Sequence, residues 1–423
     1  MKKNGFTLVE ITVCVVLLVT IFLLVVPKVN TMINNKKKNA YNSLISTVKD
    51  AAQAYVYLNV NIVDDAIESQ GYYEVSIRTL QENELLENKL ENPLTGKNIP
   101  STSIVKIIKN NEEYIYKFSL DYQYLLEHII DLYSSEETRT SNGLKKDNTP
   151  DQNIRYYGSD PNNYVSFNNE LWRIIGVFGN NVKLVRSEKL GDLSWDSSEE
   201  SINAGGGVNE WSQADLQVYL NKMYYGGTSV TCYNGENNTT TTCPTGTIDE
   251  TSKSLIDYHT WNTGAPNYNT LYNSTTKSFD TIEFYKAERG SVNGKTCSSG
   301  TYCNDTVTRT TEWPGYIGLP YVTDWAYASG EDDCNTKIDV SSTYKCKNNN
   351  WMHYGSTNND TTWVMSPFAL PVNANVVWHV RGGGRTGNVG AARPLSAFPT
   401  IYLKSNVLIE SGNGTSSDPY KLA

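Results

Sequence analysis

The sequence predicts an α+β protein that combines one long N-terminal helix, a small α+β head and a larger β-rich region stapled by disulfides. Three observations lead to this fold class. An apolar run over residues 11–26 is followed by a helical pattern that continues to about residue 58. Short strand-like segments separated by Asn-rich turns fill much of the remainder. Six of the seven cysteines lie in the C-terminal half of the chain.

The segment from Phe6 to Val26 predicts a transmembrane helix, because a bilayer core needs roughly 20 apolar residues. Lys2 and Lys3 precede it, which predicts a cytoplasmic N-terminus. Glu10 is the exception within this segment. An unpaired carboxylate in a membrane helix costs on the order of 2.5–3.5 kcal/mol, so we expect Glu10 to have a partner.

Three ordinary targeting signals explain this N-terminus poorly. A secretory signal peptide needs small residues at its cleavage site, whereas residues 27–30 read Pro-Lys-Val-Asn. A lipoprotein signal needs small residues before its cysteine, and Ile-Thr-Val before Cys14 does not supply them. A plain membrane anchor accounts for the apolar run but gives Glu10 no role.

The run Gly5-Phe6-Thr7-Leu8-Val9-Glu10 closely resembles the N-terminus of type IV pilins and pseudopilins. The resemblance implies that a prepilin peptidase cuts after Gly5 and methylates Phe6. It also matches Glu10 to the glutamate of the family and Pro27 to its mid-helix proline. The new amine at Phe6 can be neutralised by Glu10 of a neighbouring subunit, which turns two costly charges into one pair.

The region after the apolar run predicts an amphipathic helix and then a small α+β head. Apolar residues between Tyr41 and Val56 recur at steps of three and four. Val75–Leu86 has a helical pattern. Residues 103–108 and 114–120 are strand candidates around an Asn-Asn turn. This order resembles a minimal Gram-positive pilin head.

A change in composition marks the start of the C-terminal region. Residues 136–151 are rich in Ser, Thr, Glu, Lys and Asn, which is typical of a linker. All nine tryptophans lie between Trp172 and Trp378. The expected organisation is therefore a leader over 1–5, the transmembrane and N-terminal helix over 6–60, the head over 61–135, the linker over 136–151 and an aromatic-rich extracellular module over 152–423.

The C-terminal module opens with predicted hairpins. Residues 164–167 and 170–178 flank Asn168-Asn169, and Asn180-Asn181 leads into the next strand, 182–186. Three later segments also have strand patterns: 363–365, 376–380 and 400–403.

The six C-terminal cysteines fall into three local pairs, although six cysteines allow 15 connectivities. The absence of any CxxC makes a metal site the weaker alternative. Disulfides imply an oxidising, extracytoplasmic location. The expected pairs are Cys232–Cys243, Cys297–Cys303 and Cys334–Cys346.

A second resemblance covers most of residues 155–423. The runs 170–176 and 363–367, with the ending from Ala392 to Tyr420, look like an uncharacterised surface module of low-GC Gram-positive bacteria. That module is distantly similar to the C-type-lectin-like fold shared with formylglycine-generating-enzyme relatives.

The sequence predicts no catalytic residue, no metal site and no cofactor. The four histidines have no ligand spacing, and no GxSxG occurs. The net charge of −9 argues against a nucleic-acid partner. The best ligand-site candidate is His379, Arg381 and Arg385 around a glycine loop, where arginine and aromatic groups suit a sugar or peptide. The alternative is a strand end with surface arginines.

These observations predict a minor type IV pilin or pseudopilin that is not an enzyme. We expect a single-pass membrane precursor that is assembled into an extracellular filament, with the C-terminal module as an adhesive domain at the tip. The expected partners are the prepilin peptidase, other pilin subunits, the membrane and a glycan or host matrix protein. The alternatives are a pseudopilin of a type II-like secretion or competence apparatus, and an uncleaved membrane-anchored surface protein.

Overall fold

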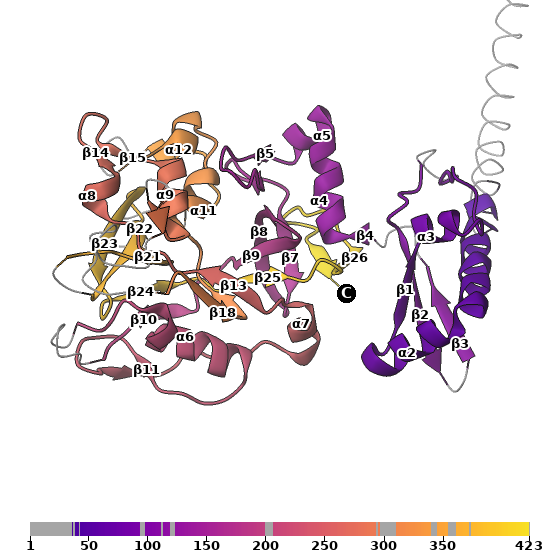
Figure 1. Ribbon diagram of the computed structural model, residues 1–423, viewed down its shortest axis with the longest axis horizontal. Coiled ribbons are helices and arrows are strands. Elements are labelled where there is room, and N and C mark those ends of the chain that lie inside the picture. Colours follow the sequence, from indigo (N-terminus) through magenta and orange to yellow (C-terminus); the bar gives the residue numbers. More distant parts are fainter. Residues whose placement is uncertain are drawn as a thin grey trace, which may run out of the picture. The chain divides into compact units, whose positions relative to one another are not determined.

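Figure 1 shows the computed structural model of the chain. It describes residues 36, 39–41, 43–93, 98–110, 113–118, 123–198, 206–292, 295–296, 310–339, 345–353, 361–371 and 374–422. The chain divides into two compact units, residues 1–123 and 124–423. The division falls before the segment that we expected to be a linker.

The predicted fold class begins with one long transmembrane and amphipathic helix. This part of the prediction is wrong. Among the described residues, no helix combines the length and apolarity needed to cross a membrane. The predicted span over residues 6–26 lies outside the described residues, as do Gly5 and Pro27. The structure confirms the coarser expectation of a mixed α+β chain with many strands.

In the first unit, the predicted amphipathic stripe forms the buried face of a helical segment over residues 43–58. Val48, Ala52 and Val56 are buried at steps of four residues. The helix is interrupted at Asn59, and α2 (Val60–Gln70) follows. Helix α2 ends at Gly71, whose left-handed backbone lets its N–H bond to the Ile67 carbonyl.

The helical segment packs on a three-stranded antiparallel sheet of order β1-β2-β3 through one hydrophobic core. The strands are β1 (Tyr73–Ser76), β2 (Ile104–Asn110) and β3 (Glu113–Lys117). The helix predicted over 75–86 is shorter, because Val75 pairs with Val105 in the sheet. Helix α3 (Ile77–Glu82) begins only after Ser76, whose hydroxyl accepts the Thr79 N–H.

The second unit begins with folded elements where the end of the head and a linker were expected. Helices α4 (Leu125–Ser134) and α5 (Glu136–Ser141) are followed by β5 (Leu144–Lys146), which pairs with β6 (Ile154–Tyr156). Residues 136–151 therefore belong to the second unit and contribute a strand to its sheet.

The larger sheet of the second unit contains the path β19-β25-β9-β8-β7-β27-β26, and β6 pairs with β8. Strand β27 runs parallel to β7, whereas the other pairs named here are antiparallel. The strands are β7 (Tyr164–Phe167), β8 (Glu170–Phe178), β9 (Asn181–Arg186), β19 (Ile317–Gly318), β25 (Thr400–Leu403), β26 (Leu408–Ser411) and β27 (Tyr420–Leu422).

The turn between β7 and β8 confirms the Asn-Asn prediction. Asn168 and Asn169 both adopt φ of 56°, a left-handed conformation that asparagine tolerates. The next turn lies one residue earlier than expected. Gly179 takes the positive φ there, and Asn181 already pairs with Phe178.

The smaller sheet has the order β10-β24-β21-β22-β23, and β21 and β24 pair in parallel. Its strands are β10 (Gly191–Ser194), β21 (Thr361–Pro367), β22 (Val376–Arg381), β23 (Arg385–Gly390) and β24 (Pro394–Ala397). Strand β23 ends this order, so one of its edges is not covered by a neighbouring strand of the sheet. Figure 1 shows helices α9 and α11 close to β21 and β22.

Short helices and strand pairs complete the second unit. The helices are η1 (Trp211–Gln213), α6 (Asp215–Val218), η2 (Tyr219–Tyr225), α7 (Glu250–Leu255), α8 (Tyr268–Leu271), α9 (Thr281–Glu288), α11 (Val322–Tyr327), α12 (Asp332–Thr336) and η3 (Lys345–Lys347). The strand groups are β11 (Cys232–Tyr233) with β12 (Thr240–Thr241), β13 (His259–Asn262) with β18 (Glu312–Gly315), β16 (Ser291–Val292) with β17 (Lys295–Thr296), and β14 (Tyr272–Asn273) with β15 (Ser278–Asp280) and β20 (Lys337–Asp339).

The structure confirms two of the three expected disulfides. Cys232 bonds to Cys243 with a Cα–Cα distance of 5.2 Å, and Cys334 bonds to Cys346 with 5.4 Å. The expected Cys297–Cys303 pair lies outside the described residues. Both observed bridges close short loops, as the sequence spacing predicted.

Replacing Cys334 and Cys346 together by alanine should lower the free energy of unfolding of the second unit by about 3 kcal/mol. The cross-link restricts the unfolded chain, and both cysteines are buried. Urea unfolding followed by tryptophan fluorescence measures the change, because all nine tryptophans lie in this unit. An unchanged unfolding midpoint would show that the bridge does not stabilise the fold.

Candidate functional site

The three residues predicted as a ligand site lie on one hairpin, formed by β22 and β23. Arg381 pairs with Arg385, and His379 pairs with Gly387. Cross-strand partners share a face of the sheet, so the hairpin register brings the two arginines together. The glycine-rich tip between them turns at Gly384, which adopts φ of 85°.

His379 is buried, with only 2% of the residue exposed. It therefore does not contact a ligand at the surface and can act only through its neighbours. Its Nε2 accepts a hydrogen bond of 2.9 Å from the Nε–H of Arg381. Burial lowers the pKa of His379 to about 3, and the charges of Arg381 and Arg385 add to this shift. The ring is therefore neutral at physiological pH, and its Nδ1 has no hydrogen-bond partner within the described part of the chain.

Gly387 makes room for this arrangement. A Cβ at this position would lie 2.8 Å from Nε2 of His379 and 3.2 Å from Nε of Arg381. A larger residue would therefore push the imidazole ring or the guanidinium out of place. The glycine thus fixes where the Arg381 side chain leaves the hairpin.

An open cavity of about 260 Å³ lies beside the hairpin. Trp378 contributes a buried indole that is held by a 2.9 Å hydrogen bond to the Pro266 carbonyl. Tyr268 contributes a half-buried ring that stacks on Tyr272 at 4.7 Å. The described lining consists of Tyr268, Trp378, Arg381, Arg385, Thr386, Gly387 and Asn388 and contains no carboxylate.

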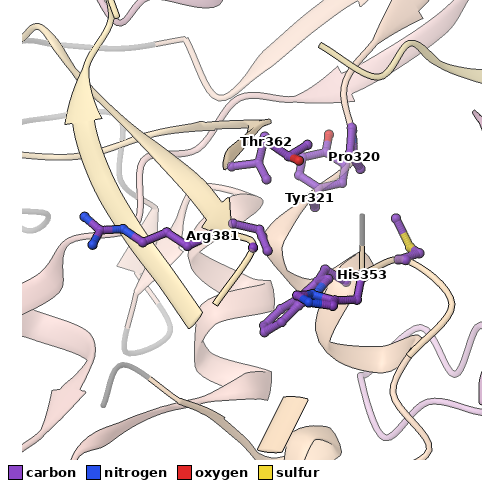
Figure 2. A pocket seen from close by; sticks show the side chains of 10 residues that line it. Pro320, Tyr321, His353, Thr362 and Arg381 are labelled. Carbon is purple, nitrogen blue, oxygen red and sulfur yellow. The ribbon is translucent and has the colours of Figure 1, made fainter. Parts of the chain in front are cut away.

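A second, narrower pocket lies on the other side of Arg381 and is shown in Figure 2. Pro320, Tyr321 and Thr362 line it, and the guanidinium of Arg381 points away from them. The space inside is about 10 Å³, which admits about one water molecule. The guanidinium of Arg381 therefore does not fill the narrow pocket.

The densest group of charges in the second unit is buried and was not predicted from the sequence. The Asp324 carboxylate accepts from Arg155 Nη1 and from Lys183 Nζ, both at 2.6 Å. Arg155 Nε also donates to Asp147 at 2.8 Å. Each of these side chains is at most 1% exposed. We name Asp147, Arg155, Lys183 and Asp324 the buried charge cluster.

The surroundings of the buried charge cluster shift the pKa values of its side chains. Burial opposes the charge on Asp324, but Lys183 and Arg155 hold the pKa of its carboxyl below the usual range. Burial lowers the pKa of Lys183 to about 8, although Asp324 favours its charged form. No residue of the buried charge cluster lines either pocket described above, so we assign the cluster a structural role.

Glu288 is a further buried carboxylate, at the end of α9. It accepts hydrogen bonds from the backbone N–H and the hydroxyl of Thr323. Burial raises its pKa to about 7, against the opposing attraction of Arg289. Glu288 therefore changes charge close to neutral pH.

Sequence reasoning named the two arginines but not Tyr268, Thr386 and Asn388, which also line the cavity. Thr386 and Asn388 follow Arg385 in the strand pattern, so the hairpin register could have indicated them. Tyr268 comes from α8, and no sequence signal connects it with the hairpin. Across the described ranges, no group of three or more His, Cys, Asp or Glu side chains is placed to hold a metal ion.

Comparisons of the chain with protein-family models, curated proteins and solved structures find no match. They therefore leave the resemblance to a C-type-lectin-like fold untested.

Replacing Asp324 by asparagine should lower the free energy of unfolding by about 3–5 kcal/mol, because Arg155 and Lys183 would remain buried without a counter-charge. The matched control is Asp192→Asn. Asp192 pairs with Lys189 on the surface, where both side chains are about half exposed. That change should cost about 0–1 kcal/mol. Equal losses in chemical denaturation would contradict the role given to the buried charge cluster.

Glu288→Gln should change how stability depends on pH. The folded-state pKa of Glu288 is raised to about 7 from 4.5, so its contribution is present below pH 4.5 and is lost as the pH rises through about 7. Relative to the glutamine variant, the wild-type chain should lose up to about 1.4 kcal/mol per pH unit in this window. Unfolding curves measured from pH 4.5 to 8 test this.

The control is Glu283→Gln on the same helix, where the carboxylate is about one-third exposed and pairs with Lys286. This variant removes a carboxylate from the same helix and leaves Glu288 in place. Parallel pH curves for Glu288→Gln and the wild-type chain would show that Glu288 does not titrate as stated.

Proposed function

We propose that the chain is a minor type IV pilin or pseudopilin, assembled into a surface filament through its N-terminal segment. The observation that carries this proposal is the run from Gly5 to Glu10 directly before an apolar segment. Cleavage after Gly5 would leave an amine at Phe6, and Glu10 of a neighbouring subunit would neutralise it. The proposed partners are the prepilin peptidase, other pilin subunits and the membrane that holds the precursor.

The architecture of the first unit supports this proposal. The helical segment over 43–58 is fixed to a three-stranded sheet by Val48, Ala52 and Val56, which are buried. A force applied to the N-terminal segment would therefore pass into a packed core. Such an arrangement suits a subunit that is held in a filament by its N-terminus.

The second unit supports a sparse, displayed subunit. It spans residues 124–423 and has its own hydrophobic core, so it would be bulky at every position of a packed shaft. The two disulfides among its described residues favour an oxidising, extracytoplasmic location. We propose that it sits at the filament tip and binds a glycan or a host matrix protein.

Mass spectrometry of protein from sheared surface filaments tests the processing step. The expected N-terminal peptide begins with N-methylated Phe6. An intact Met1, found only in the membrane fraction, would overturn the proposal and leave an anchored surface protein.

Glu10→Gln tests assembly separately from cleavage. An amide cannot neutralise the Phe6 amine, so the variant should be processed normally but fall roughly tenfold or more in the filament fraction. Glu68→Gln is the matched control, because Glu68 is exposed on α2. Normal assembly of Glu10→Gln would remove the pairing role of this carboxylate.

A further inference from the structure

We propose that the cavity beside the β22–β23 hairpin binds one sugar residue that carries a carboxylate. This inference rests on the proposed function, in which the second unit is the displayed binding module, and it names the class of ligand. It goes beyond the sequence prediction by giving separate roles to the arginines, to His379 and to three lining residues that the sequence did not indicate.

The charge of the cavity favours an anion. Arg385 contributes a positive charge, and the described lining has no carboxylate to offset it. No ion pair or side-chain hydrogen bond joins Arg385 to another residue in the described ranges, so its five N–H donors face the cavity or solvent. A planar guanidinium matches a carboxylate through two parallel hydrogen bonds.

His379 acts as a positioning residue in this site. It accepts the Nε–H of Arg381, which fixes the orientation of that guanidinium at the edge of the cavity. Because burial keeps the imidazole neutral, it adds no charge of its own to the cavity. Gly387 leaves the space in which the ring and Arg381 Nε meet.

The other lining groups favour a sugar over a peptide carboxylate. The Thr386 hydroxyl is buried beside the cavity and has no hydrogen-bond partner within the described chain, so a ligand hydroxyl that reaches it would supply one. Asn388 adds an exposed amide that can both donate and accept. The ring of Tyr268 offers a flat surface for the C–H face of a sugar.

The size of the cavity limits the ligand. Its volume of about 260 Å³ is slightly below the usual range of small-molecule pockets, about 300–1,000 Å³. One sugar residue at the end of a chain suits this space, and a longer stretch of saccharide would extend into solvent through the open side.

Calorimetric titration of the full chain tests the proposal. The probes are glucuronic acid and N-acetylneuraminic acid, which separate uronic from sialic acids as the source of the carboxylate. Glucose is the neutral control, and acetate and a short acidic peptide are the controls without a sugar. We expect binding of at least one acidic sugar and much weaker binding of the controls. Binding of glucose or the acidic peptide with equal affinity, or no binding at millimolar concentrations, would overturn the proposal.

Two variants locate the binding. Arg385→Gln should weaken acidic-sugar binding by roughly tenfold or more, because it removes a charged hydrogen-bond donor. Arg393→Gln is the matched control, because Arg393 is exposed and lies outside the cavity lining. Thermal unfolding of both variants should equal that of the wild-type chain. Equal affinities of the two variants would place the sugar elsewhere and refute the assigned site.

Substitutions of His379 separate positioning from general structure. His379→Ala should weaken binding, and His379→Gln should restore part of it, because an amide oxygen can accept the Arg381 Nε–H. Failure of glutamine to restore any binding would remove the positioning role. The mass of the N-terminal peptide is an independent readout: Phe6 processing without sugar binding refutes only the ligand class, whereas sugar binding with an intact Met1 refutes only the filament role.

Discussion

The second unit depends on one buried carboxylate that joins three distant segments of the chain. Asp324 on α11 binds Arg155 on β6 and Lys183 on β9, and it also accepts the backbone N–H of Tyr321 at 3.0 Å. Charges removed from water are tolerated only when each one is paired and hydrogen-bonded. The three segments must therefore come together in one register, because any other register would leave a buried ion without its partner.

This constraint extends towards the candidate site through α11. The helix follows Tyr321 and carries Trp325, and both residues line the narrow pocket that also contacts Val380 and Arg381. The hairpin therefore stands on a helix whose position is fixed by the buried charge cluster. Side chains that are held in this way lose less conformational freedom if a ligand binds beside them. Within the hairpin, His379 is buried, whereas Arg381 and Arg385 line the cavity.

Features governed by neighbouring residues could be predicted from the sequence. The Asn168-Asn169 turn, two short-range disulfides and the grouping of His379, Arg381 and Arg385 all follow from local chemistry or hairpin register. Features governed by distant partners could not. Residues 136–151 have the composition of a linker, yet Asp147 is buried because it pairs with Arg155. Lys183 looks like a polar residue in an apolar strand, and only the distant Asp324 explains its burial. Tyr268 reaches the cavity through tertiary packing that no pattern indicates.

The position of β27 affects how the second unit folds while the chain is being synthesised. This strand, Tyr420–Leu422, lies between β7 and β26 and is parallel to β7. One neighbour of β7 in the sheet therefore comes from the far C-terminal end of the unit. A chain emerging in order from a ribosome or a translocation channel can close the β7–β8 hairpin at once, but it cannot complete the sheet until residue 422 has emerged. Folding of this sheet is therefore delayed relative to synthesis, and during that interval β7 presents an unpaired edge, where another chain could pair with it.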